Sequence, residues 1–337
     1  MATLEVLAFL GDRAVAGIEW CRAGSYARTL RLPHGHAAVV LSATSDDHVT
    51  ARLVLGDLSD LQAAVGRCRR LLDLDADPEA VDAALGADPA LRPLVSAVPG
   101  RRVPGGVDGF ELAVRAILGQ QVSLSGARTA ARRLVDAVGR RFDLPAESLR
   151  RLCPEAGDAG DAGDAGVALT HVFPAPAELI ELEPAAFAMP TRRRRAVLAV
   201  AAAVERGEMA VDPGADRAEL RTALQGVPGV GPWTAEHIAM RALGDPDAFL
   251  PTDLGILRAM QHLGCAGTPA AAAKAADRWR PWRSYAAAHL WALSSGEQGP
   301  ARARRGAVAG AGPDPGGPME ERGPMEKGGK RENGAAA

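Results

Sequence analysis

Long apolar runs and an export signal are both missing from this chain of 337 residues, and each absence excludes a class of protein. No stretch approaches the roughly 20 consecutive apolar residues that a membrane-spanning helix needs. The first residues, MATLEVLAFLGDRAVAG, lack a basic leader and a small-residue cleavage site, so they predict no secretory signal. We therefore expect a protein without a membrane partner.

Clustered cysteines are also missing. The four cysteines, Cys21, Cys68, Cys153 and Cys265, lie far apart, and no pair has the spacing of metal ligands or of a small disulfide scaffold. The sequence therefore favours a cytoplasmic protein that requires no cofactor. A formal net charge of −2 argues against a uniformly basic nucleic-acid binder, although charge can still be segregated along the chain.

The pattern of apolar residues divides the chain into two regions. In residues 1–98, the segments TLRLP, AAVVLSAT and VTARLVLG predict short strands, and LSDLQAAVGRCRRLLDL predicts an amphipathic helix. In residues 99–298 nearly every segment predicts a helix. The sequence therefore predicts an α+β protein. Its N-terminal domain would carry an antiparallel sheet, and the all-helical region that follows would contain two subdomains.

Two segments are too simple in composition to predict a packed core. Residues 153–168 include GDAGDAGDAG and predict a flexible acidic insert, and residues 299–337 contain 10 Gly and 5 Pro and predict a disordered tail. Residues 99–152, in contrast, carry 10 Arg against 5 Asp and Glu. A basic helical block is compatible with a phosphate-facing surface, and it is equally compatible with an ordinary solvated helix face.

The stretch QGVPGVGPW, residues 225–233, should break a helix, yet helix-forming sequence flanks it on both sides. We interpret it as a tight turn between two helices. Gly229 and Gly231 would let their backbone N–H groups approach another molecule, Pro232 suits the first turn of the second helix, and Thr234 would add a hydroxyl. Such a turn suits a DNA backbone phosphate. A plain helix–helix turn is the alternative.

Asp253 precedes a predicted helix at Leu254–Leu263 in the stretch LPTDLGILRAM. Its ordinary role there is that of an N-cap, in which its carboxylate accepts a hydrogen bond from the first turn. A carboxylate at a helix N-terminus also provides a fixed negative charge. Capping and a catalytic role do not exclude each other.

These motifs resemble a known family. GVPGVGPWTAEHIAMRAL followed by DAFLPTDLGILRAM is similar to the signature of the helix-hairpin-helix/Gly-Pro-Asp DNA glycosylases. LAFLGDRAVAGIEWCRAGSYARTL, VDGFELAVRAILGQQVS and DRWRPWRSYAAAHLW narrow the resemblance to the DNA-3-methyladenine glycosylase II family, from about Leu4 to about Leu293. It implies a base-excision repair enzyme. Such an enzyme flips alkylated bases, such as 3-methyladenine and 7-methylguanine, out of double-stranded DNA and hydrolyses the N-glycosidic bond.

The resemblance also implies roles for single residues. It assigns the catalytic carboxylate to Asp253 and places Trp233, Trp291 and Phe9 in the base pocket, whose electron-rich faces suit a cationic base. At positions where relatives often carry tyrosine, this chain has His237 and Leu254 in the pocket, and only 4% of its residues are aromatic. From the sequence alone, Trp291 could equally be a core residue, and a lone histidine is more often structural.

Two further roles follow from the resemblance. Gln121 stands where relatives place an apolar wedge, so it would fill the gap that a flipped base leaves in the duplex. The backbone carbonyls of Gln225, Val227 and Val230 would hold a Na⁺ or K⁺ ion under the hairpin. Some members of the family are fused to a methyl-transfer domain. We expect no such domain here, because the similarity begins almost at the first residue.

Trp233 takes the place of the lysine with which some relatives cut the strand, and residues 207–273 contain no lysine. We therefore expect a monomeric, monofunctional enzyme that leaves an abasic site. Three alternatives stay open at this point. They are an 8-oxoguanine-type glycosylase/lyase, a non-catalytic DNA-damage-binding module, and a hairpin that contacts protein rather than DNA.

Overall fold

The computed structural model describes residues 3–22, 24–43, 48–142, 144, 147–148, 152, 169–183, 187 and 189–296. The predicted acidic insert, residues 153–168, and the predicted tail, residues 299–337, lie outside this part of the chain. Both expectations therefore stay predictions.

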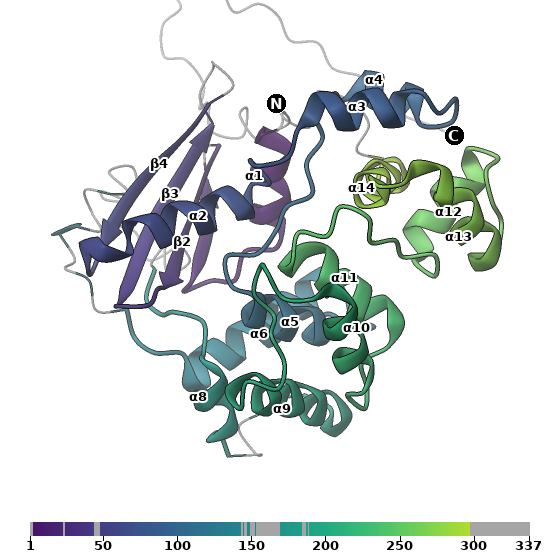
Figure 1. Cartoon of the computed structure of the whole chain (residues 1–337). Coiled ribbons are helices and arrows are strands. Elements are labelled where there is room, and N and C mark those ends of the chain that lie inside the picture. The colour runs from purple at the N-terminus through teal and green to yellow at the C-terminus, as the bar shows by residue number, and fades with distance from the viewer. Residues whose placement is uncertain are drawn as a thin grey trace, which may run out of the picture.

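The N-terminal domain is a four-stranded antiparallel sheet with strand order β1-β2-β3-β4, which confirms the predicted fold class. Helices α1 and α2 pack against one face of the sheet (Figure 1), where Leu7, Leu10, Tyr26, Leu41 and Leu71 share a buried apolar cluster. The elements are α1 (Thr3–Asp12), β1 (Glu19–Arg22), β2 (Ser25–Arg31), β3 (His36–Ala43), β4 (Val49–Leu55) and α2 (Leu61–Leu71).

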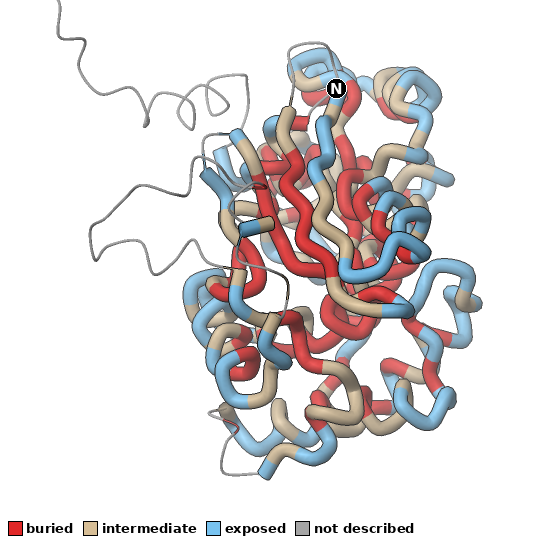
Figure 2. Tube along the Cα trace, turned by 90° about the vertical axis from the view of Figure 1, so that its left-hand side faces the viewer, coloured by how far each residue is buried: buried red, intermediate tan, exposed pale blue. Residues whose placement is uncertain are grey.

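The sheet is buried most deeply along its two central strands. Strands β2 and β3 each contain five consecutive buried residues, whereas β4 contains none, and Figure 2 shows this contrast across the sheet. Successive side chains of a strand point to opposite faces. Burial of a whole run therefore means that both faces are covered, the second one by Leu152, Phe142 and Leu169.

Helices form the rest of the described chain, in two groups with separate cores. Helix α5 is the centre of the first group, because Phe110, Val114 and Ile117 pack against α6, α9 and α11. The first group comprises α5 (Gly109–Leu118), α6 (Leu124–Val138), α8 (Pro176–Ile180), α9 (Thr191–Glu205), α10 (Arg217–Gln225) and α11 (Pro232–Ala242).

The second group is formed by C-terminal helices together with two helices from earlier in the chain (Figure 1). Val81 and Leu94 share a buried cluster with Ile256 and Leu290, so α3 and α4 pack with the C-terminal helices rather than with the sheet. A domain boundary at residue 98 stays a prediction. The group comprises α3 (Pro78–Gly86), α4 (Arg92–Ala97), α12 (Leu254–His262), α13 (Pro269–Ala276) and α14 (Arg283–Ser294).

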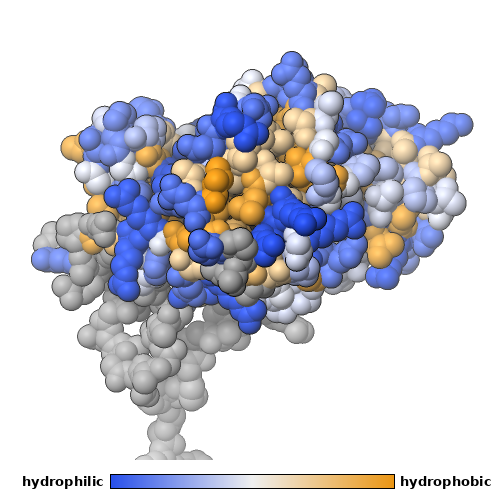
Figure 3. Space-filling view, turned by 90° about the horizontal axis from the view of Figure 1, so that it is seen from below, coloured by the Kyte–Doolittle hydropathy of each residue, from blue (hydrophilic) through white to orange (hydrophobic). Residues whose placement is uncertain are grey.

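The surface mixes apolar and hydrophilic residues. On the face at the α8 and α9 end of the molecule, apolar residues gather near the centre between hydrophilic ones (Figure 3). In the part of the chain that the structure describes, no helix is both long enough and apolar enough to cross a membrane.

A buried ion-pair network joins the sheet to α5. Arg28 on β2 contacts Glu19 at 3.1 Å and Glu111 at 2.6 Å, and Arg115 contacts the same two carboxylates at 2.9 and 2.8 Å. Burial alone would raise the pKa of the Glu19 carboxyl, but the two guanidinium groups together lower it. The network therefore fixes the N-terminal domain against the helix that leads into the central core.

Replacing Arg28 with Met tests how strongly this network joins the two regions. Among the described residues, the change leaves Arg115 as the one cation paired with the two buried carboxylates, although Tyr26 and the backbone N–H of Val15 still donate to Glu19. We therefore expect the free energy of unfolding to fall by about 3–5 kcal/mol in urea titrations. Arg69→Met is the matched control. It breaks an exposed pair with Asp75 and should cost no more than about 1 kcal/mol. Equal losses of stability in both variants would show that the buried network stabilises the fold no more than an exposed ion pair does.

Candidate active site

The predicted turn between two helices is confirmed. Helix α10 ends at Gln225, and α11 begins at Pro232, which occupies its first turn. Gly229 has φ +103°, a conformation that side chains other than glycine rarely adopt. A β-carbon placed on Gly231, the N-cap of α11, would meet no atom within 4 Å, so this backbone is open to a close-approaching ligand.

The hydroxyl of Thr234 was predicted to face a ligand, but the structure buries it. The residue is only 3% exposed, and its hydroxyl accepts a hydrogen bond of 2.9 Å from the amide of Gln120. The same amide donates to the carbonyl of Gly229 at 3.1 Å. Thr234 therefore does not present its hydroxyl to solvent. It ties the hairpin to the loop after α5, which carries the predicted wedge.

The predicted wedge residue lies in a strained loop. Gln121 is exposed and has φ +54°, an uncommon value for a residue with a side chain. Val122 and Leu124, which the sequence reasoning missed, are also exposed, at 42% and 43%. Both line a cavity that Asp253 also lines. Their position one and three residues after Gln121 was the available signal. Apolar surface therefore stands beside the glutamine.

Asp253 is confirmed as the N-cap of α12, and it accepts three hydrogen bonds. Its Oδ1 accepts the backbone N–H of Ile256 and the indole N–H of Trp291, each at 3.0 Å. Its Oδ2 accepts the indole N–H of Trp233, also at 3.0 Å. One donor comes from each of α11, α12 and α14, so three helices together fix the orientation of one carboxylate.

His237 packs against both of these tryptophans. Its ring is parallel to that of Trp233, with centroids 5.1 Å apart and an angle of 6°, and it meets Trp291 edge-on at 6.3 Å. Burial, helped by the positive charges of Arg241 and Arg13, lowers the pKa of the imidazole to about 3. The ring is therefore neutral near pH 7. Its Nδ1 is buried and has no hydrogen-bond partner among the described residues.

A cavity of about 580 Å³ opens beside these residues. Asp253, Trp233, Trp291 and His237 line it from the helical region, and Phe9 lines it from α1. The structure thus brings together five residues from four separate segments of the sequence. The volume of the cavity lies within the range of small-molecule binding sites.

Leu254 is the one predicted pocket residue that the structure does not place there. It is 66% exposed and lies outside the cavity lining. The reason is geometric, because the residue after an N-cap begins the helix and its side chain leaves in another direction. Ala292 does line the cavity, and its small side chain leaves space there.

Two arginines cover Phe9, which the sequence reasoning did not anticipate. The guanidinium carbon of Arg13 lies 3.6 Å from the centroid of the Phe9 ring, and that of Arg241 lies 4.9 Å from it. Burial and the charge of Arg13 lower the pKa of Arg241 to about 9, so it still carries its proton near neutral pH. Arg13 comes directly after the last residue of α1 and four residues after Phe9, a spacing that brings the two side chains to one side of the helix end.

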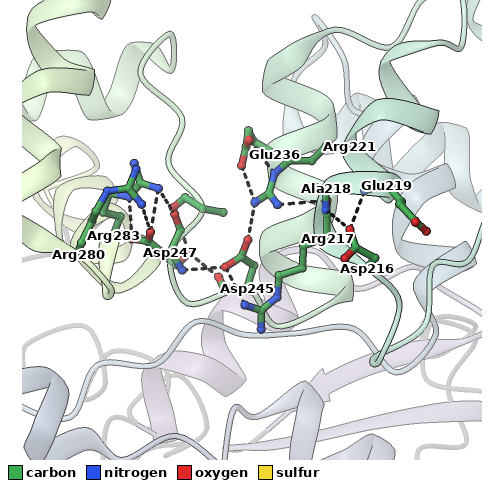
Figure 4. Close-up of polar contacts among 12 residues, drawn as sticks. Asp216, Arg217, Ala218, Glu219, Arg221, Glu236, Asp245, Asp247, Arg280 and Arg283 are labelled. Carbon is green, nitrogen blue, oxygen red and sulfur yellow. Dashed lines mark hydrogen bonds and ion pairs between the residues drawn. The ribbon is translucent and has the colours of Figure 1, made fainter.

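Charged side chains fix the loop that leads from α11 to Asp253 (Figure 4). Arg221 on α10 contacts Glu236 on α11 at 2.8 Å and also pairs with Asp245. Two residues further on, Asp247 pairs with Arg283 of α14 at 2.7 Å. These contacts bind both hairpin helices to the loop and the loop to α14. They therefore support the relative positions of Trp233, Trp291 and Asp253.

A monovalent cation at the hairpin stays a prediction. The carbonyl of Val227 accepts the N–H of Val230 at 3.0 Å, but a carbonyl oxygen has a second lone pair. Together with Gln225 the donor set is neutral carbonyl oxygen, which suits Na⁺ or K⁺. Within the described ranges, no group of three or more His, Cys, Asp or Glu residues could hold another metal.

A hairpin followed by a capping aspartate, with aromatic residues around a cavity between them, defines a helix-hairpin-helix glycosylase. Comparisons with known proteins agree. A family model described as the AlkA N-terminal domain matches residues 1–108. A 3-methyladenine DNA glycosylase from Archaeoglobus fulgidus has the same fold, with a TM-score of 0.69 at 18% identity over 87% of this chain and 94% of that one.

Curated relatives identify the family. DNA-3-methyladenine glycosylase 2 of Escherichia coli is 32% identical over 290 residues, which are 85% of this chain and 92% of that protein. The probable bifunctional transcriptional activator/DNA repair enzyme AlkA of Mycobacterium tuberculosis is 48% identical over 286 residues, which are 85% of this chain. The chain spans about half the length of that relative, 53%. The chain belongs to the AlkA family of DNA-3-methyladenine glycosylases.

The neutral state of His237 predicts a pH dependence of stability. As pH falls below about 6.5, the unfolded chain binds a proton that the folded imidazole resists down to about pH 3. Stability should therefore decrease with acidification across that window. His237→Gln cannot titrate, so its free energy of unfolding should fall less steeply between pH 6.5 and 4 in urea titrations. An unchanged slope would mean that His237 is protonated in the folded protein.

Proposed function

We propose that this chain is an alkylbase DNA glycosylase of base-excision repair. The observation that carries the proposal is the Asp253 carboxylate, held by two indole N–H groups at the edge of a cavity large enough for a base. Its family membership gives the chemistry, since the E. coli relative is named a DNA-3-methyladenine glycosylase. The substrate is double-stranded DNA with alkylated bases, such as 3-methyladenine and 7-methylguanine. The chain acts as a monomer.

The damaged nucleotide leaves the stack and enters the cavity. Extrusion costs a few kcal/mol and is easiest for damaged pairs. The loop at Gln121 and Val122 fills the vacated space, and the open backbone at Gly229 and Gly231 holds a nearby phosphate. Some structures that share this fold hold DNA, which supports DNA as the partner.

Cleavage breaks the bond between the base and C1′ of the sugar, and the electron pair of that bond leaves with the base. Positive charge develops on the sugar, and the Asp253 carboxylate stabilises it. Water then adds to C1′, and Asp253 takes up its proton. A base methylated at N3 or N7 is already cationic, so it leaves without a proton donor. One carboxylate is therefore sufficient.

The site favours hydrolysis over strand cleavage. A lyase forms a Schiff base through a lysine amine. No lysine lines the cavity in the part of the chain that the structure describes, and Trp233 uses its N–H to hold Asp253. The product is an abasic site. Chromosomal DNA is the substrate and the curated relatives are bacterial, so we place the protein in the bacterial cytosol.

The two arginines at Phe9 bear on the choice of base. The guanidinium of Arg13 occupies the face of the Phe9 ring, so it moves aside before a base stacks there. Arg13 and Arg241 also place positive charge near the pocket, which opposes a cationic base, whereas Asp253 and the indole faces favour one. The pocket therefore discriminates between bases through this balance of charge as well as through shape.

Asp253→Asn separates the chemistry from helix capping. Asparagine is as good an N-cap as aspartate, but its Nδ2 cannot accept an indole N–H, so one of the two tryptophans loses its bond and the melting temperature should fall by a few degrees. The charge beside the sugar is lost, and we expect the single-turnover release of 3-methyladenine and 7-methylguanine from methylated duplex DNA to fall about 10²–10³-fold.

Each rival function gives a different result in the same assay. Full base release by Asp253→Asn would contradict the role of the carboxylate. A borohydride-trapped covalent complex with strand nicking would indicate a glycosylase/lyase. DNA binding by the wild-type protein without any base release would indicate a non-catalytic damage-binding module.

A further inference from the structure

Four consecutive arginines, Arg192–Arg195, begin helix α9 directly after its first residue. The N-terminus of a helix carries partial positive charge and favours acidic residues. This first turn contains no acidic residue, and the N-cap, Pro190, makes no side-chain cap. The run is therefore unfavourable for the helix itself. Local rules are broken in this way mainly where function requires it.

The run lies against the hairpin and the wedge loop. A β-carbon placed on Gly229 would lie 3.6 Å from Cγ and 3.7 Å from Nε of Arg192, so this side chain borders the hairpin turn. Arg193 donates from Nη2 to the carbonyl of Gln120 at 2.5 Å, in the loop that carries the wedge. Three segments that are distant in sequence thus share one surface.

Arg192 and Arg195 are the two exposed arginines of this run, whereas Arg193 and Arg194 are half-buried. The two exposed arginines are three residues apart, so they lie on one face of α9. Among the described residues neither forms an ion pair or a side-chain hydrogen bond. Neither lines the cavity beside Asp253. Within the described part of the chain, no protein partner therefore accounts for these two guanidinium groups.

We propose that Arg192 and Arg195 form a second phosphate-binding site, next to the hairpin and on the same DNA strand. The inference rests on DNA being the substrate of the proposed function. The hairpin offers one phosphate its open backbone at Gly231, and the guanidinium groups bind the neighbouring phosphates of the strand as it runs along α9. Guanidinium matches phosphate oxygens with paired hydrogen bonds, which suits arginine better than lysine.

This arrangement gives Arg193 a separate positioning role. Because it bonds the wedge loop while Arg192 borders the hairpin, α9 joins the two segments that contact DNA. The site should raise affinity without altering the chemical step, since its charges stand outside the cavity. Its effect should also depend on salt, because each neutralised phosphate releases a counterion.

The test uses Arg192→Gln, Arg195→Gln and the double variant of the full chain. Binding to an undamaged duplex is measured by fluorescence anisotropy between 50 and 200 mM KCl. The slope of log affinity against log salt should become shallower by about 0.9 for each arginine and about 1.8 for both. The maximal single-turnover rate of base release should stay within about twofold of wild type. Melting temperatures should be equal or higher, because positive charge leaves a helix N-terminus.

Arg206→Gln is the matched control. Arg206 is the C-cap of the same helix, is exposed, and pairs with Glu208 at 2.7 Å. Its loss should therefore leave the salt slope unchanged. A wild-type slope in the double variant would overturn the proposal, and so would an equal decrease in Arg206→Gln. The readout is binding, so the proposed catalytic function fails separately. Wild type that binds with this slope difference but releases no base would leave the phosphate site intact.

Discussion

The convergence of two indole N–H groups and one backbone N–H on the Asp253 carboxylate is the interaction on which the rest of the site depends. It brings α11, α12 and α14 to one point, and it uses both carboxylate oxygens. In the proposed reaction, a carboxylate held in this way does not need to reorient when positive charge develops on the sugar. Preorganisation of this kind is a large part of electrostatic catalysis.

The same few residues of the hairpin take part in this interaction and in the proposed DNA contact. Gly231 has an open backbone, and Trp233, two positions later, holds Asp253. A shift of α11 would therefore disturb the proposed phosphate contact and the orientation of the carboxylate together. The contacts of Arg221 with Glu236 and Asp245 oppose such a shift, since they tie α10 and α11 to the loop before Asp253.

The N-terminal domain completes the cavity rather than merely flanking it. Phe9 on α1 and Arg13 directly after it line the cavity, and the ion pairs of Arg28 with Glu19 and Glu111 hold that domain against α5. The cavity is therefore built across two regions with separate cores. Its electrostatics combine one fixed carboxylate with guanidinium groups that cover the Phe9 ring.

Local features of the fold could be predicted from the sequence, whereas contacts between distant side chains could not. The turn at 226–231, the N-cap at Asp253 and the antiparallel sheet follow from residue type and periodicity, and all three are confirmed. The indole bonds to Asp253 span 20 and 38 residues, so no spacing rule reveals them. The burial of Thr234 likewise depends on a partner more than a hundred residues earlier.

The position of single side chains around the pocket was only partly accessible. The family resemblance predicts Leu254 in the pocket, but helix geometry turns its side chain toward solvent. The contact of Arg13 with Phe9 could have been found from their helical spacing, whereas that of Arg241 depends on how α11 meets α1. Pairs four residues apart on one helix are predictable, and pairs between helices require the structure.

The most direct test of the central interaction is the indole region of a ¹⁵N–¹H correlation spectrum, recorded for wild type and for Asp253→Ala. The protein has five tryptophans, and only Trp233 and Trp291 donate to this carboxylate. The account predicts that these two indole resonances move and exchange faster with solvent, while the other three keep their positions. Two unmoved resonances for Trp233 and Trp291 would show that neither indole holds Asp253, and the site would lose its organising contact.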